Sequence, residues 1–278
     1  MSLDNQSLLK TVYSIARRQS FDGSWSAFHL RPGGSNHWTT AAALTALGSV
    51  DRRQTQAPKW LKQTQQRGWM RLEQDAINQP LGFNAMTPTD ADSTTWLCRA
   101  LVQRCFNLRN NHQQEYYLAS EKWLMKCLEY LEEHIEPTQN GMKTYIEADQ
   151  ILEFVGHSGG KSSWFGVHHC VSANAIELGK ELQKYLPDIN VNLSSTLASL
   201  EIKCEPFWWT DKLIIELLLK KLEYLDGKIS PSSLVLRVPL HHDKTGNITS
   251  YSNASDIEGG SCEDNGIFSD TLSVLLSD

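Results

Sequence analysis

Residues 87–102 read TPTDADSTTWLCRALV. In this stretch a polar loop with two acids, Asp90 and Asp92, stands directly before a run of residues that are small or apolar on most helical faces. A helix with so little polar surface must be surrounded by protein on nearly all sides. We therefore predict an interior helix over residues 95–102, with an acidic loop at its N-terminal end.

The same unit of helix, polar loop and apolar helix returns with a period of roughly 45 to 60 residues, which is typical of arrays of helical hairpins. Its first helix is amphipathic, as residues 122–133 show, and its second is apolar or small, as in WTTAAALTAL at residues 38–47. Amphipathic helices outside and apolar helices inside form an (α/α) barrel. The sequence thus predicts an all-α toroid of five to six helical hairpins, in a single domain over residues 1–278.

The predicted outer helices cover residues 8–19, 58–69, 117–134 and 193–203, and the predicted inner helices cover residues 38–47, 95–102, 171–178 and 210–217. A weaker fifth unit pairs residues 232–238 with residues 268–276. A sixth unit would need a short helix near residues 143–154. Without that helix the ring is open, or it is completed by a partner domain or a second copy of the chain.

Composition narrows the class of protein. A formal net charge of −6 argues against a nucleic-acid partner. No apolar run approaches the roughly 18 residues of a transmembrane helix, and the N-terminus shows neither the basic start nor the apolar segment of a signal peptide. Six scattered cysteines without a Cys-x-x-Cys pair indicate buried, reduced thiols. We expect a cytoplasmic protein.

The acidic loop at residues 90–94 has two interpretations. Asp, Ser and Thr before a helix satisfy its free N–H groups and suit its dipole, which makes the loop a helix cap. An acid beside another acid can also have its pKa raised, which leaves a protonated carboxyl available as a proton donor. The spacing of Asp90 and Asp92 leaves both interpretations open.

In this setting the chain resembles the class II terpene cyclases and the squalene–hopene cyclase superfamily. Their motif, Asp-x-Asp-Asp/Thr-Thr at the mouth of an inner helix, is similar to DADST at residues 90–94. The resemblance implies that Asp92 is the general acid and Asp90 the flanking acid. Ser93 departs from the Asp of the hopene cyclases and is nearer to the Asp-x-Asp-Thr-Thr variant of bacterial cyclases that act on prenyl diphosphates.

Two further motifs carry the resemblance. VSAN at residues 171–174 is similar to the family's Val-Ser/Thr-x-His, in which the last residue hydrogen-bonds the acid, and Asn174 takes that position here. An amide can orient the acid proton without becoming charged. QSFDGSW at residues 19–25 is similar to the family's Gln/Trp repeat, which ties outer helices together.

An apolar isoprenoid substrate would need aromatic walls and, if it carries a diphosphate, cations. The chain has nine tryptophans, and aromatic faces hold carbocations by cation–π attraction. The candidate wall residues are Trp96, Trp164, Phe165, Trp208, Trp209 and Phe268, each of which could instead be plain core packing. The candidate diphosphate contacts are Arg31, Lys161 and His168, each of which could instead be a solvated surface charge. We expect no metal site in the protein itself, although Mg²⁺ could accompany a diphosphate substrate.

These observations together predict a protonation-initiated cyclase that acts on a linear polyprenyl substrate, with farnesyl or geranylgeranyl diphosphate as first candidates. Two alternatives stay open. The toroid could be a non-catalytic ligand- or protein-binding module whose acidic loop is only a cap. It could also be a protein prenyltransferase β-like subunit, although CED at residues 262–264 is not followed by the Tyr-His pair that would complete its zinc ligands.

Overall fold

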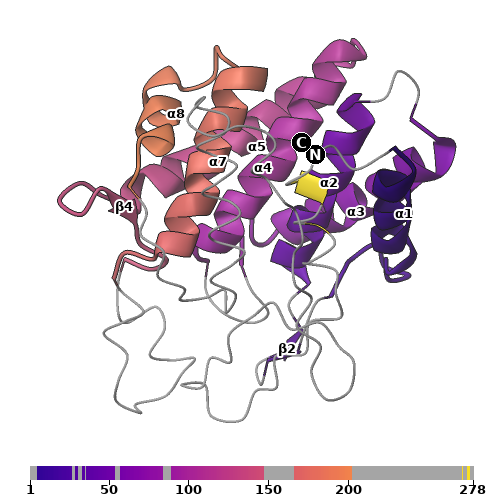
Figure 1. Ribbon diagram of the computed structural model, residues 1–278, viewed down its shortest axis with the longest axis horizontal. Helices are drawn as coiled ribbons and strands as arrows, with labels where there is room; N and C mark the ends of the chain where they lie inside the picture. The colour runs from indigo at the N-terminus through magenta and orange to yellow at the C-terminus, as the bar shows by residue number, and fades with distance from the viewer. Residues whose placement is uncertain are drawn as a thin grey trace.

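The computed structural model describes residues 5–26, 29–30, 33–34, 36–53, 57–83, 89–146, 166–201, 271 and 274–275. The helices with described bounds are α1 (Asn5–Arg17), α2 (His37–Arg53), α3 (Lys59–Ala76), α4 (Ala91–Asn110), α5 (Gln114–Glu133), α7 (His169–Tyr185) and α8 (Val191–Ala198). Two antiparallel hairpins join β1 (His29–Leu30) to β2 (Gly33–Gly34) and β3 (Ile135–Glu136) to β4 (Gly141–Met142). The prediction of an all-α fold is confirmed (Figure 1).

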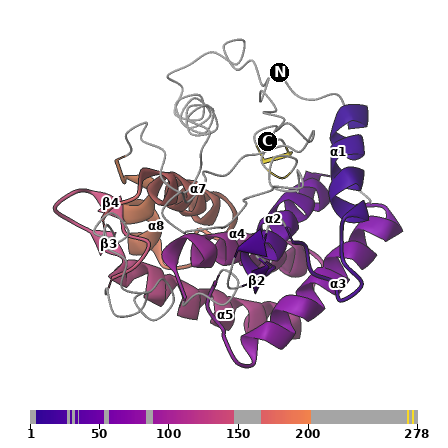
Figure 2. The same cartoon turned by 90° about the horizontal axis from the view of Figure 1, so that it is seen from below.

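The helices form an inner row and an outer row. In the inner row α4 lies between α2 and α7, while α1 and α3 pack on α2, α5 packs on α4, and α8 packs on α7. Figure 2 shows α1, α3, α5 and α8 arranged as an arc around α2, α4 and α7. The predicted alternation of outer and inner helices therefore holds along the described chain from α1 to α8.

Burial explains which helices lie inside. Every residue of α2 from His37 to Val50 and every residue of α4 from Ala91 to Gln103 is buried. In α5 the buried residues form one stripe, Ser120, Leu124, Cys127, Leu128 and Leu131, at the spacing of a single helical face. Helices that are mostly apolar or small on all sides are thus in the inner row, and a helix with one buried stripe is in the outer row.

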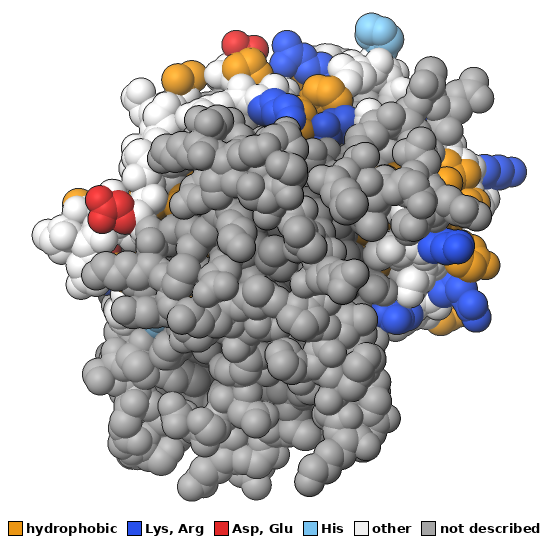
Figure 3. Space-filling view, viewed as in Figure 1, with side chains coloured by type: hydrophobic (Ala, Val, Ile, Leu, Met, Phe, Trp, Pro, Cys, Tyr) orange, Lys and Arg blue, Asp and Glu red, His pale blue; other side chains and the backbone are white. Residues whose placement is uncertain are grey.

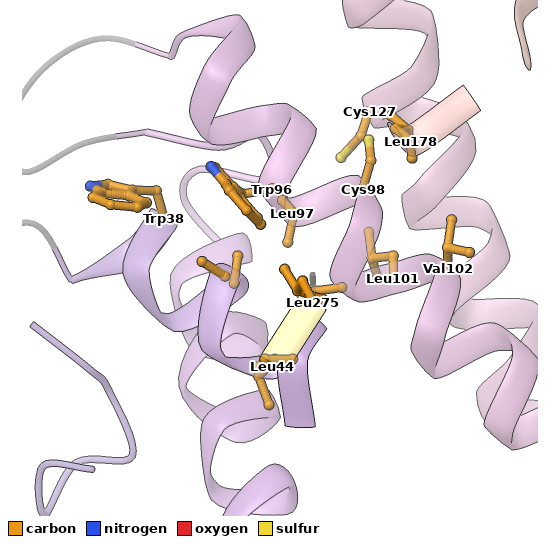
Figure 4. Close-up of a cluster of buried hydrophobic side chains, with 14 of the residues drawn as sticks. Trp38, Leu44, Trp96, Leu97, Cys98, Leu101, Val102, Cys127, Leu178 and Leu275 are labelled. Atoms are coloured by element: carbon orange, nitrogen blue, oxygen red, sulfur yellow. The ribbon is translucent and has the colours of Figure 1, made fainter. Parts of the chain in front are cut away.

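The core joins residues that are far apart in the sequence. Figure 4 shows Leu275 between Leu44 of α2 and Leu101 of α4, and all three side chains belong to one buried cluster. The outer surface is mixed: Figure 3 shows Lys and Arg side chains beside hydrophobic ones on the flank where α1 lies. Of the helices described, none is long and apolar enough to cross a membrane.

The Gln/Trp stretch ties two outer helices together, as the resemblance implies. The side chain of Gln19 donates through Nε2 to the carbonyl oxygens of Gly23 and Thr64, both at 2.9 Å. The fully buried indole of Trp25 donates through Nε1 to the carbonyl oxygen of Ile15 at 2.8 Å. Because Ile15 lies in α1 and Thr64 in α3, the two helices are joined through this loop.

Some predicted elements differ from the structure. The helix predicted over residues 193–203 is α8, which begins at Val191 and already ends at Ala198, because Ser199 adopts a non-helical conformation. Residues 143–146, where a short helix was considered, are not helical. The two hairpins are absent from the sequence prediction, since strands of two residues carry no periodicity. The helices predicted over residues 210–217 and 232–238 lie outside the described residues, as does most of 268–276.

Gly68 tests the contact between α3 and the Trp25 ring. A Cβ added at Gly68 would lie 2.8 Å from Trp25 Cζ3 and 3.0 Å from Leu44 Cδ2. Glycine-to-alanine changes within helices usually stabilise, by about 1 kcal/mol. Here the added methyl would press on two side chains that are themselves buried, so we expect Gly68→Ala to lower the unfolding free energy by about 1–3 kcal/mol, measured by urea denaturation. Gln66→Ala, at an exposed position of the same helix, should change it by less than about 0.5 kcal/mol. A stabilised Gly68→Ala variant would show that the ring is not packed as described.

Candidate active site

The inner helix α4 begins at a capped acid. Asp90 has extended backbone angles, φ −136° and ψ 158°, which suit an N-cap residue. Its Oδ1 accepts a hydrogen bond from the Ser93 backbone N–H, and its Oδ2 accepts one from the Ser93 hydroxyl, both at 2.7 Å. For Asp90, the cap interpretation is therefore what the structure shows, and Ser93 engages both carboxyl oxygens.

The protonation of Asp90 is set by burial. Burial raises the pKa of Asp90 from 3.8 to about 6, and hydrogen bonds from Ser93 and from the Asp92 backbone only partly oppose the rise. A neighbouring acid was the cause expected for a raised pKa in this loop, whereas for Asp90 the largest cause is the loss of water. Tyr130 lies near this carboxyl: its hydroxyl donates to the Thr89 carbonyl oxygen at 3.1 Å, and burial, with the negative charge of Asp90, raises the pKa of the phenol.

Asp92 lies in the first turn of α4 and meets a side chain from the next inner helix. Nδ2 of Asn174, on α7, donates to Asp92 Oδ1 at 3.4 Å. Both side chains are buried, with 7% of Asp92 and 1% of Asn174 exposed. The structure thus brings together two candidate residues that are 82 positions apart in the sequence.

The short segment 142–144, which follows α5, holds the starts of α4 and α7 in place. The N–H of Ala91, at the start of α4, donates to the Thr144 carbonyl oxygen at 3.0 Å. The N–H of Met142, in β4, donates to the hydroxyl oxygen of Ser172, on α7, at 2.8 Å. The hairpin β3–β4 therefore fixes the starts of α4 and α7 relative to each other, and with them Asp92 and Asn174.

His168, a candidate diphosphate contact, is part of the same bracing. It is the N-cap of α7, is only 3% exposed, and hydrogen-bonds through Nδ1 to the Thr144 hydroxyl. The backbone N–H of His168 donates to the Met142 carbonyl oxygen at 2.9 Å. The alternative of a solvated surface charge does not hold for His168, because the side chain is buried and engaged at the start of the helix.

A buried arginine completes the group around Asn174. Nη1 of Arg99, on α4, donates to Asn174 Oδ1 at 2.9 Å. Its Nε and Nη2 donate to the carboxylate of Glu181, on α7, with a closest distance of 2.8 Å. The guanidinium carbon lies 4.9 Å from the centre of the Trp96 ring, over its face. Asp92, Asn174, Arg99 and Glu181 therefore form one connected polar chain between the two inner helices.

Arg99 and Glu181 were missed in the sequence analysis, although a signal was present. Arg99 is a charged residue in the stretch 95–102, which is otherwise apolar or small, and a buried charge needs a counter-charge. It follows Asp92 by seven positions, and Glu181 follows Asn174 by seven, so each pair lies two turns apart on one face of its helix. These two equal spacings could have suggested that Arg99 and Glu181 meet between the two helices.

A neutral histidine lies beside the acidic loop and was also missed. The ring of His37, the first residue of α2, stacks on the Phe83 ring with centroids 4.2 Å apart. Phe83 forms a β-bridge with Thr89, directly before Asp90. Burial, followed by the charge of Arg71, lowers the pKa of His37 to about 3, so the imidazole is uncharged near neutral pH. Among the described residues neither ring nitrogen has a hydrogen-bond partner.

The remaining candidates divide into one described residue and several that are not described. Trp96 is fully buried in the core, and Figure 4 shows it near Trp38, each close to the start of its helix. The other candidates lie outside the described residues: Trp164, Phe165, Trp208, Trp209, Phe268, Arg31 and Lys161.

The described residues do not offer a metal site. Within them, no group of three or more His, Cys, Asp or Glu side chains could hold a metal ion. Cys262, Glu263 and Asp264, considered for zinc in the prenyltransferase alternative, are outside the described residues.

Comparison with solved structures defines the class of fold: it is that of a type II terpene cyclase. The solved structures that this chain matches include several of the type II terpene cyclase MstE from Scytonema. A complex with the substrate geranylgeranyl dihydroxybenzoate superimposes with a TM-score of 0.58 at 16% identity, covering 98% of this chain and 72% of that one. A complex with the product merosterolic acid A superimposes with a TM-score of 0.56 at 17% identity, covering 82% of this chain.

The chain is shorter than the cyclases it matches, and it spans 62% of the length of the product-bound one. The ligand-free MstE structure superimposes with a TM-score of 0.53 at 16% identity. No family model matches the sequence, and neither does any curated protein. The likeness is therefore one of fold.

The raised pKa of Asp90 predicts a pH dependence of stability. A carboxyl whose pKa is higher in the folded state than in the unfolded chain stabilises the fold while it is protonated, and that contribution is lost as the pH rises. From 3.8 to about 6, the difference corresponds to about 3 kcal/mol. We expect Asp90→Asn, which can still cap the helix, to become more stable relative to the wild type by up to this amount between pH 4 and pH 7. Urea denaturation across this range measures it, and parallel curves for the two proteins would contradict the assignment.

Proposed function

We propose that the chain is a protonation-initiated cyclase of a linear polyprenyl substrate. The observation that carries the proposal is the contact between Asp92 and Asn174, because it gives one buried carboxyl a hydrogen-bond donor that cannot take its proton. The fold shared with type II terpene cyclases supports the same conclusion.

The carboxyls of Asp90 and Asp92 have different neighbours, and we assign them different roles in the reaction for that reason. Asp90 is committed to Ser93 through both oxygens and serves the helix start. Asp92 accepts from Asn174 on Oδ1, and we assign the transferable proton to its other oxygen, Oδ2. Transfer of that proton to the terminal alkene forms a C–H bond and leaves a tertiary carbocation, which the next double bond attacks to close a ring. A base then removes a proton from the last cation and restores a double bond.

The substrate is proposed to be a prenyl diphosphate, with farnesyl and geranylgeranyl diphosphate as the first candidates. Ser93 and Asn174 are both nearer to the diphosphate-using variants of the motif than to the hopene-type ones. The MstE complexes hold a geranylgeranyl chain on a dihydroxybenzoate head group. A prenyl diphosphate and geranylgeranyl dihydroxybenzoate thus share a polyprenyl tail, and they differ in the head group.

The role of Asp92 predicts the effect of removing its proton. Asp92→Asn keeps the shape of the side chain, so the helical circular dichroism should be unchanged, while cyclisation of farnesyl or geranylgeranyl diphosphate should fall by at least about 10³-fold. Products are measured by mass spectrometry after dephosphorylation. In D₂O the wild-type product should gain one deuterium at the protonated carbon.

Asp188→Asn, at an exposed position after α7, is the control and should keep the wild-type rate. A full rate for Asp92→Asn would exclude Asp92 as the donor. Failure of the wild type to convert any polyprenyl substrate of 10 to 30 carbons would favour the non-catalytic binding module instead.

The head group can be tested separately from the acid. Farnesyl diphosphate should be cyclised with its diphosphate retained, because protonation begins at the far alkene. A chelator should lower the rate if Mg²⁺ accompanies the diphosphate, and neutral replacements of Arg31 or Lys161 should raise KM more than they lower kcat. Farnesol or geranylgeranyl dihydroxybenzoate, turned over with an equal kcat/KM without Mg²⁺, would overturn the diphosphate assignment and leave the protonation step standing.

A further inference from the structure

The orientation of the Asn174 amide decides whether the proton of Asp92 is available. An amide group has a donor end and an acceptor end of nearly the same shape, so it can be turned by 180° without changing the packing. With Nδ2 toward Asp92, the amide donates to Oδ1 and the acid proton stays on Oδ2. With Oδ1 toward Asp92, the amide would accept the acid proton and hold it away from the substrate. A site that relies on asparagine therefore needs something that selects one orientation.

Arg99 makes that selection. A guanidinium has only donors, and its Nη1 lies 2.9 Å from Asn174 Oδ1. If the amide turned over, its NH₂ group would face the guanidinium N–H groups, donor against donor, in a place where Arg99 is 2% exposed and Asn174 1%. No water can then replace the lost partner, so the turned amide is strongly disfavoured.

Glu181 fixes Arg99 and neutralises its charge. It accepts from Nε at 3.2 Å and from Nη2 at 2.8 Å, a side-on arrangement that holds the plane of the guanidinium. The Trp96 ring lies against one face of that plane. Without Glu181, a full positive charge would stand one amide away from Asp92 and would favour the carboxylate, the form that has no proton to give.

We propose that Arg99 and Glu181 are positioning residues that lock Asn174 with its donor end toward Asp92. This inference rests on the proposed protonation mechanism. It predicts that, while the charge of Arg99 is neutralised by Glu181, the arginine affects kcat chiefly through the orientation of the Asn174 amide.

A double-mutant cycle tests this dependence. Arg99→Met should lower kcat by about 10- to 100-fold, within the range of a supporting acid–base contact, and should change KM by less than about threefold. Asn174→Ala should lower kcat to a similar extent. In the Asn174→Ala background, Arg99→Met should lower kcat by less than about threefold more, since there is no amide left to orient. If the double variant instead shows the product of the two single losses of kcat, the two residues act independently and the proposal is overturned.

The control is an arginine of the same helix with the same kinds of contact. Arg104 forms an ion pair with Glu73 at 2.5 Å and lies 4.5 Å from the Trp69 ring centre, but it faces α3 and not Asp92. Arg104→Met should therefore keep the wild-type kcat. Loss of activity in Arg104→Met equal to that in Arg99→Met would mean that any disturbed arginine of α4 has this effect, and would overturn the proposal.

A second variant guards against loss of folding. Arg99→Met alone leaves Glu181 without its partner, so the double replacement Arg99→Met with Glu181→Leu removes both charges and should fold with wild-type circular dichroism. Its kcat should stay as low as that of Arg99→Met, because the amide remains unlocked. Recovery of the wild-type kcat would show that only the unpaired charge mattered. Should Asp92→Asn be inactive while Arg99→Met keeps its full rate, this inference fails and the proposed function survives.

Discussion

The guanidinium of Arg99 is a full positive charge in a stretch of α4 where every neighbouring residue is buried. A charge in that position must be neutralised and hydrogen-bonded within the protein. Glu181 and Asn174 meet this requirement from α7, and Trp96 covers a face of the group from α4 itself. Satisfying the arginine therefore sets the register between two inner helices, and it leaves the Asn174 amide with its donor end toward Asp92.

The acidic motif does two things at once, and the surroundings of each acid separate them. Asp90 lies before the first turn, where the backbone N–H of Ser93 has no carbonyl partner within the helix, and its carboxylate caps the helix by accepting from that N–H. Asp92 is two residues further on, inside the first turn, and turns toward α7 instead. A cap and a candidate proton donor are thus compatible in one motif. The cap orders the loop that presents the donor.

The relative position of α4 and α7 depends on a feature with little sequence signal. The hairpin β3–β4 turns the chain back after α5, so that Thr144 meets the start of α4 and Met142 meets Ser172 of α7. A Cβ added at Gly141 would lie 2.3 Å from Val167 Cγ1, so a larger residue there would have to displace the Val167 side chain. The hydrogen bonds made by Thr144 and Met142 hold the starts of α4 and α7 at the end of the protein where the acids lie.

Helical periodicity alone was enough to predict the class of fold, the outer and inner helices from α1 to α8, and the acidic loop as the start of an inner helix. These features depend on residues within a few turns of one another, and burial on all sides of α2 and α4 follows from their composition. Resemblance to a known motif pointed to Asp92 and Asn174. The tertiary structure alone decided that Arg99 and Glu181 join them, that His168 braces a helix start, and that burial makes His37 neutral. Arg99 meets Asn174 across 75 positions and Glu181 across 82. Contacts at that separation are set by the packing of whole helices, which local sequence patterns do not encode.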